Sequence, residues 1–242
     1  MSTSVCLSII IPVFNGEDCI EECLSSILSQ VFKDYEIIIK DGLSTDRTLD
    51  IIRKLNNKKI KIVSSSDSGI YDAMNQGIEY SSGNWIIFMG SDDSFTSPDV
   101  LRKIFDGASI LGDVELIYGG GITKGVNLIN SFNWRMLKGN SLNHQCIFYK
   151  RTIFNRLMYD ISYKLAADYK LNLILYVNRV KSLKRKNIII SNFGSGGASS
   201  LNKPQGFLEE CLVRKEVLGS IFGSILNSIL YLKFKLLFLF VK

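Results

Sequence analysis

The first hundred residues alternate between short apolar runs and amphipathic stretches, and this rhythm restricts the fold more than any other feature. Residues 7–13 form a short apolar run of the kind expected for a strand covered on both faces. Residues 20–31 then place apolar side chains at helical spacing. Repeated strand and helix units predict an α/β fold, with a mostly parallel sheet flanked by helices and right-handed crossovers. Further strands are expected at 35–39, 60–63 and 85–89, and helices at 49–55 and 70–80, with another opened by Ser97–Pro98.

The rhythm changes from about Val114 onward. Strands are predicted at 115–118, 127–134, 145–149 and 187–192, a helix at 165–177, and a flexible loop at 194–199. The triplet Gly119-Gly120-Gly121 is interpreted as a turn. No linker rich in Gly, Pro or Ser splits the chain. We therefore expect a single domain over 1–216, with a mixed-sheet region from 114 to 216 after a first half of 1–113, and a distinct tail at 217–242.

Composition narrows the functional classes. With 46% hydrophobic and 21% charged residues, the chain is expected to fold rather than to be disordered. The formal charge of +6 is uneven, because Lys and Arg outnumber the acids after about Glu115. That asymmetry predicts an anionic partner. Nucleic acid is excluded as this partner because basic residues do not interleave with aromatic residues on any recognisable module.

The cysteines and the N-terminus predict a location. The five cysteines are odd in number and show no metal-binding spacing, which favours buried thiols in a reducing compartment. No basic and then apolar signal segment opens the chain, so we expect a cytoplasmic protein.

The C-terminal tail is apolar on one face. Leu218, Ile221 and Ile225 recur at helical spacing, and Lys233 and Lys235 interrupt the later apolar run. The clean apolar stretch is too short to span a bilayer, so an amphipathic helix in the membrane interface is expected. A helix packed on the protein's own core, or a homo-oligomer contact, is the alternative.

Polar clusters follow each of the first four predicted strands. In parallel sheets a ligand sits beyond the carboxyl ends of the strands, so these loops are expected to meet at one edge. The fourth strand ends at the adjacent acids Asp92 and Asp93. Two neighbouring carboxylates at the end of a buried strand are costly, and Mg²⁺ or Mn²⁺ relieves that cost while sharing its oxygen ligands with substrate phosphates. The alternative is that Asp93 caps the following helix and Asp92 is solvated.

Several blocks of sequence, taken together in order and spacing, resemble the family 2 glycosyltransferases with the GT-A fold. The resemblance is to bacterial enzymes that assemble O-antigen, capsule or exopolysaccharide repeat units. It is strong over about residues 5–105 and continues more weakly beyond. The blocks are Ser8–Asn15, Ile39–Thr48, Asp67–Ile78, Asp92-Asp93, His144-Gln145, Ala167-Asp168 and 196–199.

The resemblance implies a nucleotide-sugar site at the strand ends. The first strand would supply one wall of the nucleobase pocket, and the acids after strands two and three would contact the nucleotide. Asp72 would hold the donor or brace the metal loop, although a first-turn acid also suits the helix dipole. For Asp41 an Asx turn with Gly42 is the structural alternative. The donor-binding residues expected are Pro12, Phe14, Asn15, Asp41, Asp67, Gly69, Asp72, Ser91 and Asp92.

The expected metal ligands are Asp92 and Asp93, with Mn²⁺ or Mg²⁺ as the cation. The sequence departs here from the Asp-x-Asp pattern that GT-A enzymes commonly carry, because Gly90 stands at the first acidic position. Asp92 matches the second acid, which in the family coordinates the cation that bridges the two phosphates. The departure puts the first acid's ribose or metal contact in doubt.

The resemblance also implies a catalytic base and an acceptor site. Asp168 opens a predicted helix and matches an acid that family members carry in this region, often written Glu-Asp, although Ala167 replaces the Glu. It is the expected base of a single inverting displacement, with helix capping as the alternative. His144, Gln145 and Trp134 are expected to bind the acceptor, although each is also an ordinary structural residue.

We therefore expect an inverting, metal-dependent glycosyltransferase that moves a sugar, most simply from a UDP-sugar, to a polyprenyl-diphosphate-linked glycan. It would act peripherally at the inner face of a bacterial cytoplasmic membrane, in surface polysaccharide synthesis. One alternative is a sugar-phosphate nucleotidyltransferase, although the acidic loop after the first strand does not suit a triphosphate. The other is a non-enzymatic peripheral membrane module, for which four polar loops at one sheet edge would have no use.

Overall fold

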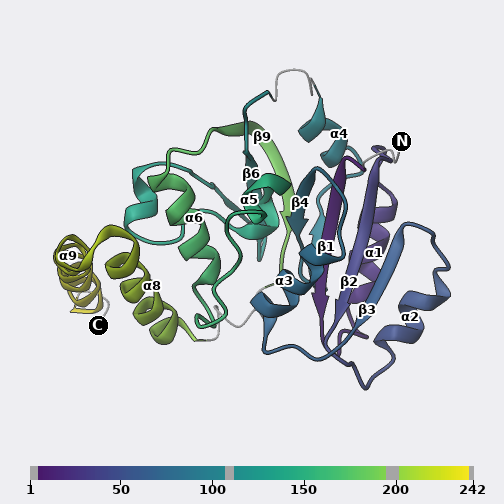
Figure 1. Ribbon diagram of the computed structural model, residues 1–242, viewed down its shortest axis with the longest axis horizontal. Coiled ribbons are helices and arrows are strands. Elements are labelled where there is room, and N and C mark those ends of the chain that lie inside the picture. The colour runs from purple at the N-terminus through teal and green to yellow at the C-terminus, as the bar shows by residue number, and fades with distance from the viewer. Residues whose placement is uncertain (1–4, 107–111, 195–201, 240–242) are drawn as a thin grey trace.

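The computed structural model describes residues 5–106, 112–194 and 202–239, and within them nine strands form one sheet (Figure 1). The strands follow the order β3-β2-β1-β4-β8-β6-β9-β5, with β7 paired to β6. The strands are β1 Leu7–Val13, β2 Tyr35–Asp41, β3 Ile60–Ser64, β4 Trp85–Phe88, β5 Ser94–Phe95, β6 Leu116–Thr123, β7 Val126–Leu128, β8 Ile147–Lys150 and β9 Ser182–Asn192. The helices are α1 Ile20–Leu28, α2 Thr48–Lys54, α3 Ile70–Glu79, α4 Val100–Phe105, α5 Arg151–Phe154, α6 Ala167–Val177, α8 Lys203–Leu218 and α9 Ser220–Leu239, with 3-10 turns η2 Trp134–Leu137 and η3 His144–Cys146.

The first four strands run parallel, as the strand and helix alternation predicts. Leu7 of β1 lies opposite Tyr35 of β2 on one side and Trp85 of β4 on the other. Because β1 has a neighbour on both sides and helices over both faces, all its residues are buried, which explains the unbroken apolar run.

Helices cover both faces of the sheet. Ile9 and Ile11 point into a core under α1, α2 and α4, whereas Ile10 points into a second core under α3, α5 and α6. This alternation follows from the two-residue period of a strand. Both cores contain residues from the later strands, so the sheet continues across residue 113. The division at 113 and the start of the tail at 217 remain predictions.

The second half makes the sheet mixed, as expected. Strand β8 runs antiparallel to both β4 and β6, while β9 runs parallel to β6. The α/β class with a mixed-sheet region is thereby confirmed.

The glycine triplet is not a turn. Gly119, Gly120 and Gly121 lie inside β6, paired with β9. A Cβ atom on Gly119 would lie 2.7 Å from the carbonyl oxygen of Ile188. The glycines therefore allow the close approach of β9. The turn prediction was wrong because it considered only neighbouring residues in the sequence.

Two other expectations about local structure were wrong. The predicted strand at 127–134 stops at Leu128, because the buried Asn130 side chain donates to the carbonyl of Gly119 at 2.7 Å and so replaces ladder pairing. The helix expected at Ser97–Pro98 begins only at Val100, because the Ser97 and Pro98 carbonyls accept hydrogen bonds from residues just after α1.

The tail is helical and packs against an element that the sequence reading missed. Helix α8 precedes α9, and the two pack against each other at the end of the molecule away from β1–β3 (Figure 1). In the part of the chain that the structure describes, no helix has both the length and the hydropathy needed to cross a bilayer. The predicted loop at 194–199 lies mostly outside the described residues.

Candidate active site

The loops after β1, β2, β3 and β4 meet at one edge of the sheet. The amide of Gly42 donates to the carbonyl of Val13, and the amide of Asn15 donates to Ser44 Oγ at 2.9 Å. Of the residues predicted to bind the sugar donor, Pro12 on β1 is buried, whereas Phe14, just after β1, is 64% exposed. Phe14 therefore presents an aromatic surface to a ligand at this edge, as a nucleobase pocket requires.

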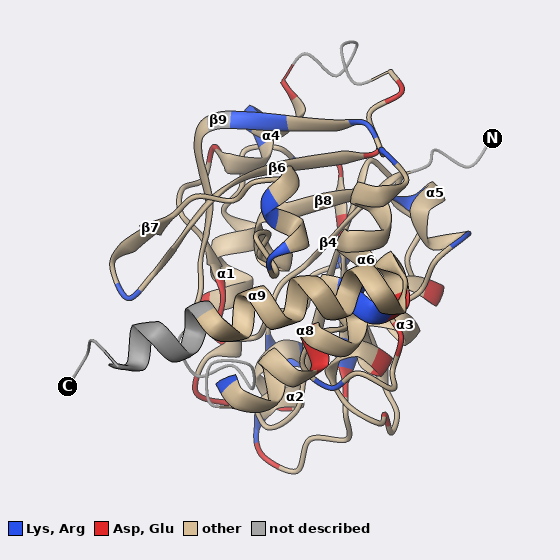
Figure 2. Ribbon diagram, turned by 90° about the vertical axis from the view of Figure 1, so that its left-hand side faces the viewer, with Lys and Arg blue, Asp and Glu red and all other residues tan. Residues whose placement is uncertain are grey.

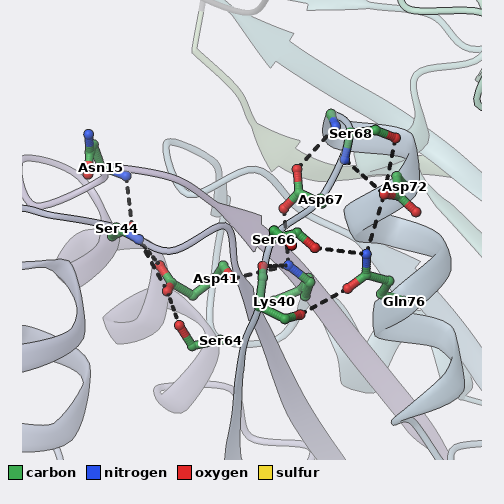
Figure 3. Close-up of polar contacts among 12 residues, drawn as sticks. Asn15, Lys40, Asp41, Ser44, Ser64, Ser66, Asp67, Ser68, Asp72 and Gln76 are labelled. Atoms are coloured by element: carbon green, nitrogen blue, oxygen red, sulfur yellow. Dashed lines mark hydrogen bonds and ion pairs between the residues drawn. The ribbon is translucent and has the colours of Figure 1, made fainter.

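The predicted nucleotide-binding acids at the ends of β2 and β3 are joined by a buried cation (Figure 3). Lys40 is fully buried, and its Nζ donates to Asp67 Oδ2 at 3.0 Å and to the carbonyls of Asp41 and Ser65. The Asp41 carboxylate is also buried and accepts from the amide of Ser44 and, at 2.6 Å, from Ser64 Oγ. Asp41 therefore makes the Asx-type contact of the structural alternative, while its backbone fixes the strand end.

The loop between β3 and α3 is open to solvent. Gly69 has a backbone φ of +129°, a conformation that favours glycine, and no neighbouring atom lies within 4 Å of the position of an added Cβ. The Asp72 carboxylate accepts from the amide and hydroxyl of Ser68, and these bonds lower its pKa. Asp72 thus holds the shape of a loop in which Gly69 leaves room for a ligand.

The two adjacent acids after β4 have different environments. Asp92 is exposed, whereas Asp93 is 2% exposed, and burial raises the pKa of Asp93 to about 6. Asp93 Oδ2 accepts from the amide of Gly90 and so closes the loop. A Cβ on Gly90 would lie 2.8 Å from Asp92 Oδ1 and 3.1 Å from Asp93 Oδ2, so a larger residue here would require both carboxylates to shift. Ser91 lies beside Gly16 of the β1 loop.

The side chains available as metal ligands in this loop limit the kind of cation that it can bind. Among the described residues, no group of three or more His, Cys, Asp or Glu side chains could hold a metal ion. A single exposed carboxylate does fit Mg²⁺ or Mn²⁺ that is shared with substrate phosphates, since such ions keep most of their coordination for phosphate and water. The residues present therefore fit a cation that binds together with a nucleotide diphosphate, with Asp92 as the protein ligand.

Asp168 lies at the start of α6, as predicted, and lines a cavity of about 700 Å³. It is 8% exposed. Its Oδ1 accepts from Tyr71 OH at 3.0 Å, and its Oδ2 accepts from Asn140 Nδ2 at 2.8 Å. Because Tyr71 belongs to α3 and Asn140 to the loop after η2, Asp168 joins the strand-end loops to the second half of the sheet.

The predicted acceptor residues divide into two groups. His144 and Gln145 line the cavity, and His144 Nδ1 lies 3.5 Å from Asp168 Oδ2. Trp134 does not line it: its ring is 54% exposed on η2, with Lys138 Nζ 4.3 Å from the ring centroid. The structure thus brings His144 and Gln145 to Asp168 and leaves Trp134 outside.

The sequence reading missed four residues that shape the site. Lys40 had a visible signal, since a lone lysine closes the apolar run Ile37–Ile39. Tyr71, Asn140 and Glu210 had none, because each becomes relevant only when distant elements pack together. Burial raises the pKa of Glu210, which lines the same cavity as Asp168.

The chain was compared with known families and proteins. Residues 8–161 match the family model described as glycosyl transferase family 2. A PGL/p-HBAD biosynthesis glycosyltransferase from Mycobacterium bovis is 32% identical over 217 residues, which cover 84% of this chain and 82% of the relative. A poly(ribitol-phosphate) beta-glucosyltransferase from Bacillus spizizenii is 36% identical over 129 residues, covering 49% of this chain and 20% of that protein.

Solved structures with a similar fold are also glycosyltransferases. Residues 1–349 of TarS from S. aureus, in complex with UDP-GlcNAc, align with a TM-score of 0.74 at 19% identity, over 93% of this chain and 71% of that one. The mannosyltransferase PcManGT from Pyrobaculum calidifontis, in complex with GDP-Man and Mn²⁺, aligns with a TM-score of 0.68 at 15% identity, over 93% of this chain and 69% of that one. At these identities the likeness establishes the GT-A fold alone.

Proposed function

This chain belongs to glycosyl transferase family 2, and we propose that it transfers one sugar, with inversion, from a UDP-sugar to a lipid-diphosphate-linked glycan. The observation that carries the proposal is the place of Asp168. Its carboxylate lines a cavity and is bonded on one oxygen to α3, which begins at the strand-end loops. A base at that boundary can face a donor on one side and an acceptor on the other.

The donor is assigned to the half before residue 114. Phe14 is exposed for stacking, and Lys40 holds the ends of β2 and β3 in register. Asp92 is the protein ligand for a cation. When bound, Mn²⁺ or Mg²⁺ would neutralise charge on the leaving diphosphate. Structures of similar fold with UDP-GlcNAc, and with GDP-Man and Mn²⁺, support this assignment.

Asp168 Oδ2 is assigned as the general base. The acceptor hydroxyl oxygen forms a bond to the anomeric carbon of the donor sugar, and its proton passes to the carboxylate. On the opposite side of that carbon, the bond to the diphosphate oxygen breaks, and its electron pair leaves with the diphosphate. One displacement with one base inverts the configuration. Asn140 and Tyr71 orient the carboxylate for this step.

The acceptor is assigned to the half from 114 to 216. His144, Gln145 and Asn143 give the cavity wall amide and imidazole groups, which suit sugar hydroxyls. Lys124 and Lys203 line the same cavity and are exposed, so they provide positive charge for an acceptor diphosphate. The relatives named for PGL/p-HBAD biosynthesis and for glucosyl transfer to poly(ribitol-phosphate) support an acceptor in cell-surface glycan synthesis.

We further propose that the protein works at the inner face of a bacterial cytoplasmic membrane. Support comes from the exposed apolar face of α9, where the side chains of Ile221, Phe222, Ile225 and Ile229 are all more than half exposed. Such a face suits the membrane interface, although self-association would also cover it.

The decisive experiment combines one variant with a donor screen. UDP-sugars and GDP-sugars are tested by thermal shift with and without Mn²⁺, and the best donor is then used for turnover with a lipid-diphosphate acceptor. We expect Asp168→Asn to bind the donor like the wild type but to lose transfer by roughly a thousandfold or more. Wild-type turnover in Asp168→Asn would remove the base from this position. Stabilisation by GDP-sugars alone would contradict the UDP assignment.

A further inference from the structure

A cation is buried in the C-terminal pair of helices, outside the residues that the family model matches. Arg214 of α8 is fully buried. Its guanidinium donates to Asn227 Oδ1 of α9 at 2.6 Å, to the carbonyl of Lys138 at 3.2 Å, and to Tyr169 OH of α6 at 3.4 Å. Removing a charge from water is costly unless it is paired, so this position requires fixed partners.

The charged partner of Arg214 is Glu210, one turn earlier in α8. Arg214 Nη1 lies 3.3 Å from Glu210 Oε2, while Glu210 Oε1 accepts from the amide of Asn140 at 3.3 Å. The Glu210 carboxylate also packs closely against the backbone of Gly139, because a Cβ added there would lie 3.1 Å from Glu210 Oε2. The ion pair therefore holds both ends of residues 138–140, at the Lys138 carbonyl and at the Asn140 amide.

The side chain of Asn140 reaches the reaction site. Its Nδ2 donates to Asp168 Oδ2 at 2.8 Å. Because the ion pair fixes the backbone of Asn140, it also fixes where this donor lies. Asn227 extends the same network to α9, since its Nδ2 donates to the carbonyl of Cys211 at 2.8 Å while its Oδ1 accepts from Arg214.

We propose that Arg214 and Glu210 are positioning residues for glycosyl transfer, which hold residues 138–140 so that Asn140 orients the carboxylate of Asp168. The inference rests on the proposed role of Asp168 as the base. It gives the α8–α9 pair a part in the reaction, although neither residue touches the reacting atoms. A small misplacement of the base lowers turnover without weakening donor binding, because the donor loops lie on β1–β4.

The test measures kcat and KM in the full chain for Arg214→Met, Arg214→Lys and Glu210→Gln. We expect kcat to fall roughly ten- to a hundredfold in Arg214→Met and Glu210→Gln, with the donor KM unchanged within about twofold. Arg214→Lys keeps the charge and should recover part of the lost kcat. A wild-type kcat in both Arg214→Met and Glu210→Gln would overturn the proposal.

The matched control is Lys170→Met. Lys170 of α6 also joins this helix to α8, through Glu216, and pairs with Asp160 at 2.6 Å, so its two ion pairs do not involve residues 138–140. Its loss should lower the melting temperature and leave kcat unchanged below melting. If Lys170→Met lowered kcat as much as Arg214→Met, general loosening of α6 and α8 would explain the effect, and the proposal would fail.

A double-mutant cycle tests the path itself and does not need Arg214→Met to fold. If Glu210 acts through Asn140, then Glu210→Gln combined with Asn140→Ala should lower kcat no more than about threefold beyond the worse single variant. Multiplicative losses would show separate roles and contradict the path. Asp168→Asn separates the two claims. If this variant is active, Asp168 is not the base, and the proposed function fails. If it is inactive while the Arg214 and Glu210 variants turn over normally, only the positioning role fails.

Discussion

Lys40 shows how one side chain can organise two strand ends. Its ammonium group is fully buried and contacts the carboxylate of Asp67 and two backbone carbonyls, one from each of β2 and the β3 loop. A buried ammonium group is costly unless it is paired, so the need to keep these three oxygen partners favours one relative height of the loops that are proposed to hold the nucleotide.

Replacing Lys40 therefore has a predictable cost. We expect Lys40→Met to lower the free energy of unfolding by about 1–3 kcal/mol, since two carbonyls and the partly exposed Asp67 lose their partner. UDP binding should weaken as well. Urea unfolding and calorimetric titration with UDP measure the two effects. Lys58→Met, which removes an exposed lysine from the turn before β3, is the control and should change stability by less than about 0.5 kcal/mol. Equal stability of the two variants would refute the role of Lys40.

Substitutions of the adjacent acids Asp92 and Asp93 should have different effects. Asp92 is exposed, so Asp92→Ala should fold normally and lose both transfer and Mn²⁺-dependent UDP binding. Asp93→Ala leaves the partly buried amide of Gly90 without its acceptor, so it should cost about 1 kcal/mol of stability. Thermal unfolding and UDP titration with and without Mn²⁺ distinguish them. Unchanged Mn²⁺ dependence in Asp92→Ala would exclude it as a ligand.

At the scale of elements, β6 and β9 define the second half of the sheet. They pair in parallel with shifts of register between Tyr118 and Gly121, and the glycines of β6 let the backbone of β9 approach. The chain just after β9 also brings Gly194 against Asp92, and a Cβ added to Gly194 would overlap the Asp92 carboxylate. The glycines thus help to join the second half of the sheet to the loop of the proposed metal ligand.

This close approach predicts the effect of a single methyl group. In Gly119→Ala the Cβ would lie 2.7 Å from the carbonyl oxygen of Ile188, a backbone atom that cannot rotate away. We expect a loss of about 1–3 kcal/mol in the free energy of unfolding, measured by urea denaturation. Gly206→Ala in α8 meets no atom within 4 Å and should be neutral or stabilising. A neutral Gly119→Ala would mean that β9 lies farther from β6.

At the scale of the whole molecule, exposed apolar side chains gather on α9 at the C-terminal end. Residues 217–242 contain three lysines and no acid, and residues 220–232 carry no charge at all. Figure 2 shows the described, uncharged part of α9 lying on the outside of the molecule. An exposed apolar helix next to the helix that lines the proposed acceptor cavity is well placed for an acceptor with a lipid anchor.

The membrane proposal predicts binding to vesicles. The full chain should float with vesicles that contain anionic lipid and should bind less to purely zwitterionic ones. The double variant Ile221→Ser, Ile225→Ser should lose this binding and keep donor binding. Light scattering tests the alternative, self-association. If the wild type does not float with vesicles but forms a stable dimer, and the double variant is a monomer, the surface is a dimer contact and membrane docking is refuted.

Local patterns in the sequence predicted much of the first half. The strands β1 to β4, the helices between them and the carboxyl edge where their loops meet follow from apolar periodicity, because the buried strands β1, β2 and β4 and the half-buried edge strand β3 each carry their apolar residues in short local runs. The start of α6, at Ala167 just before Asp168, was also predicted to within two residues, because small residues precede a run with helical spacing.

Only the tertiary structure decided which residues complete the site. Asp92 and Asp93 were both expected as metal ligands, and only the structure shows that Asp93 is buried and bonded to the Gly90 amide while Asp92 is exposed. The glycines of β6, the bond from Asn140 to Asp168 and the burial of Arg214 depend on contacts between residues far apart in the chain. Periodicity reports what a residue's own helix or strand requires, whereas these roles come from a neighbouring element whose position is set only when the whole sheet and its covering helices pack together.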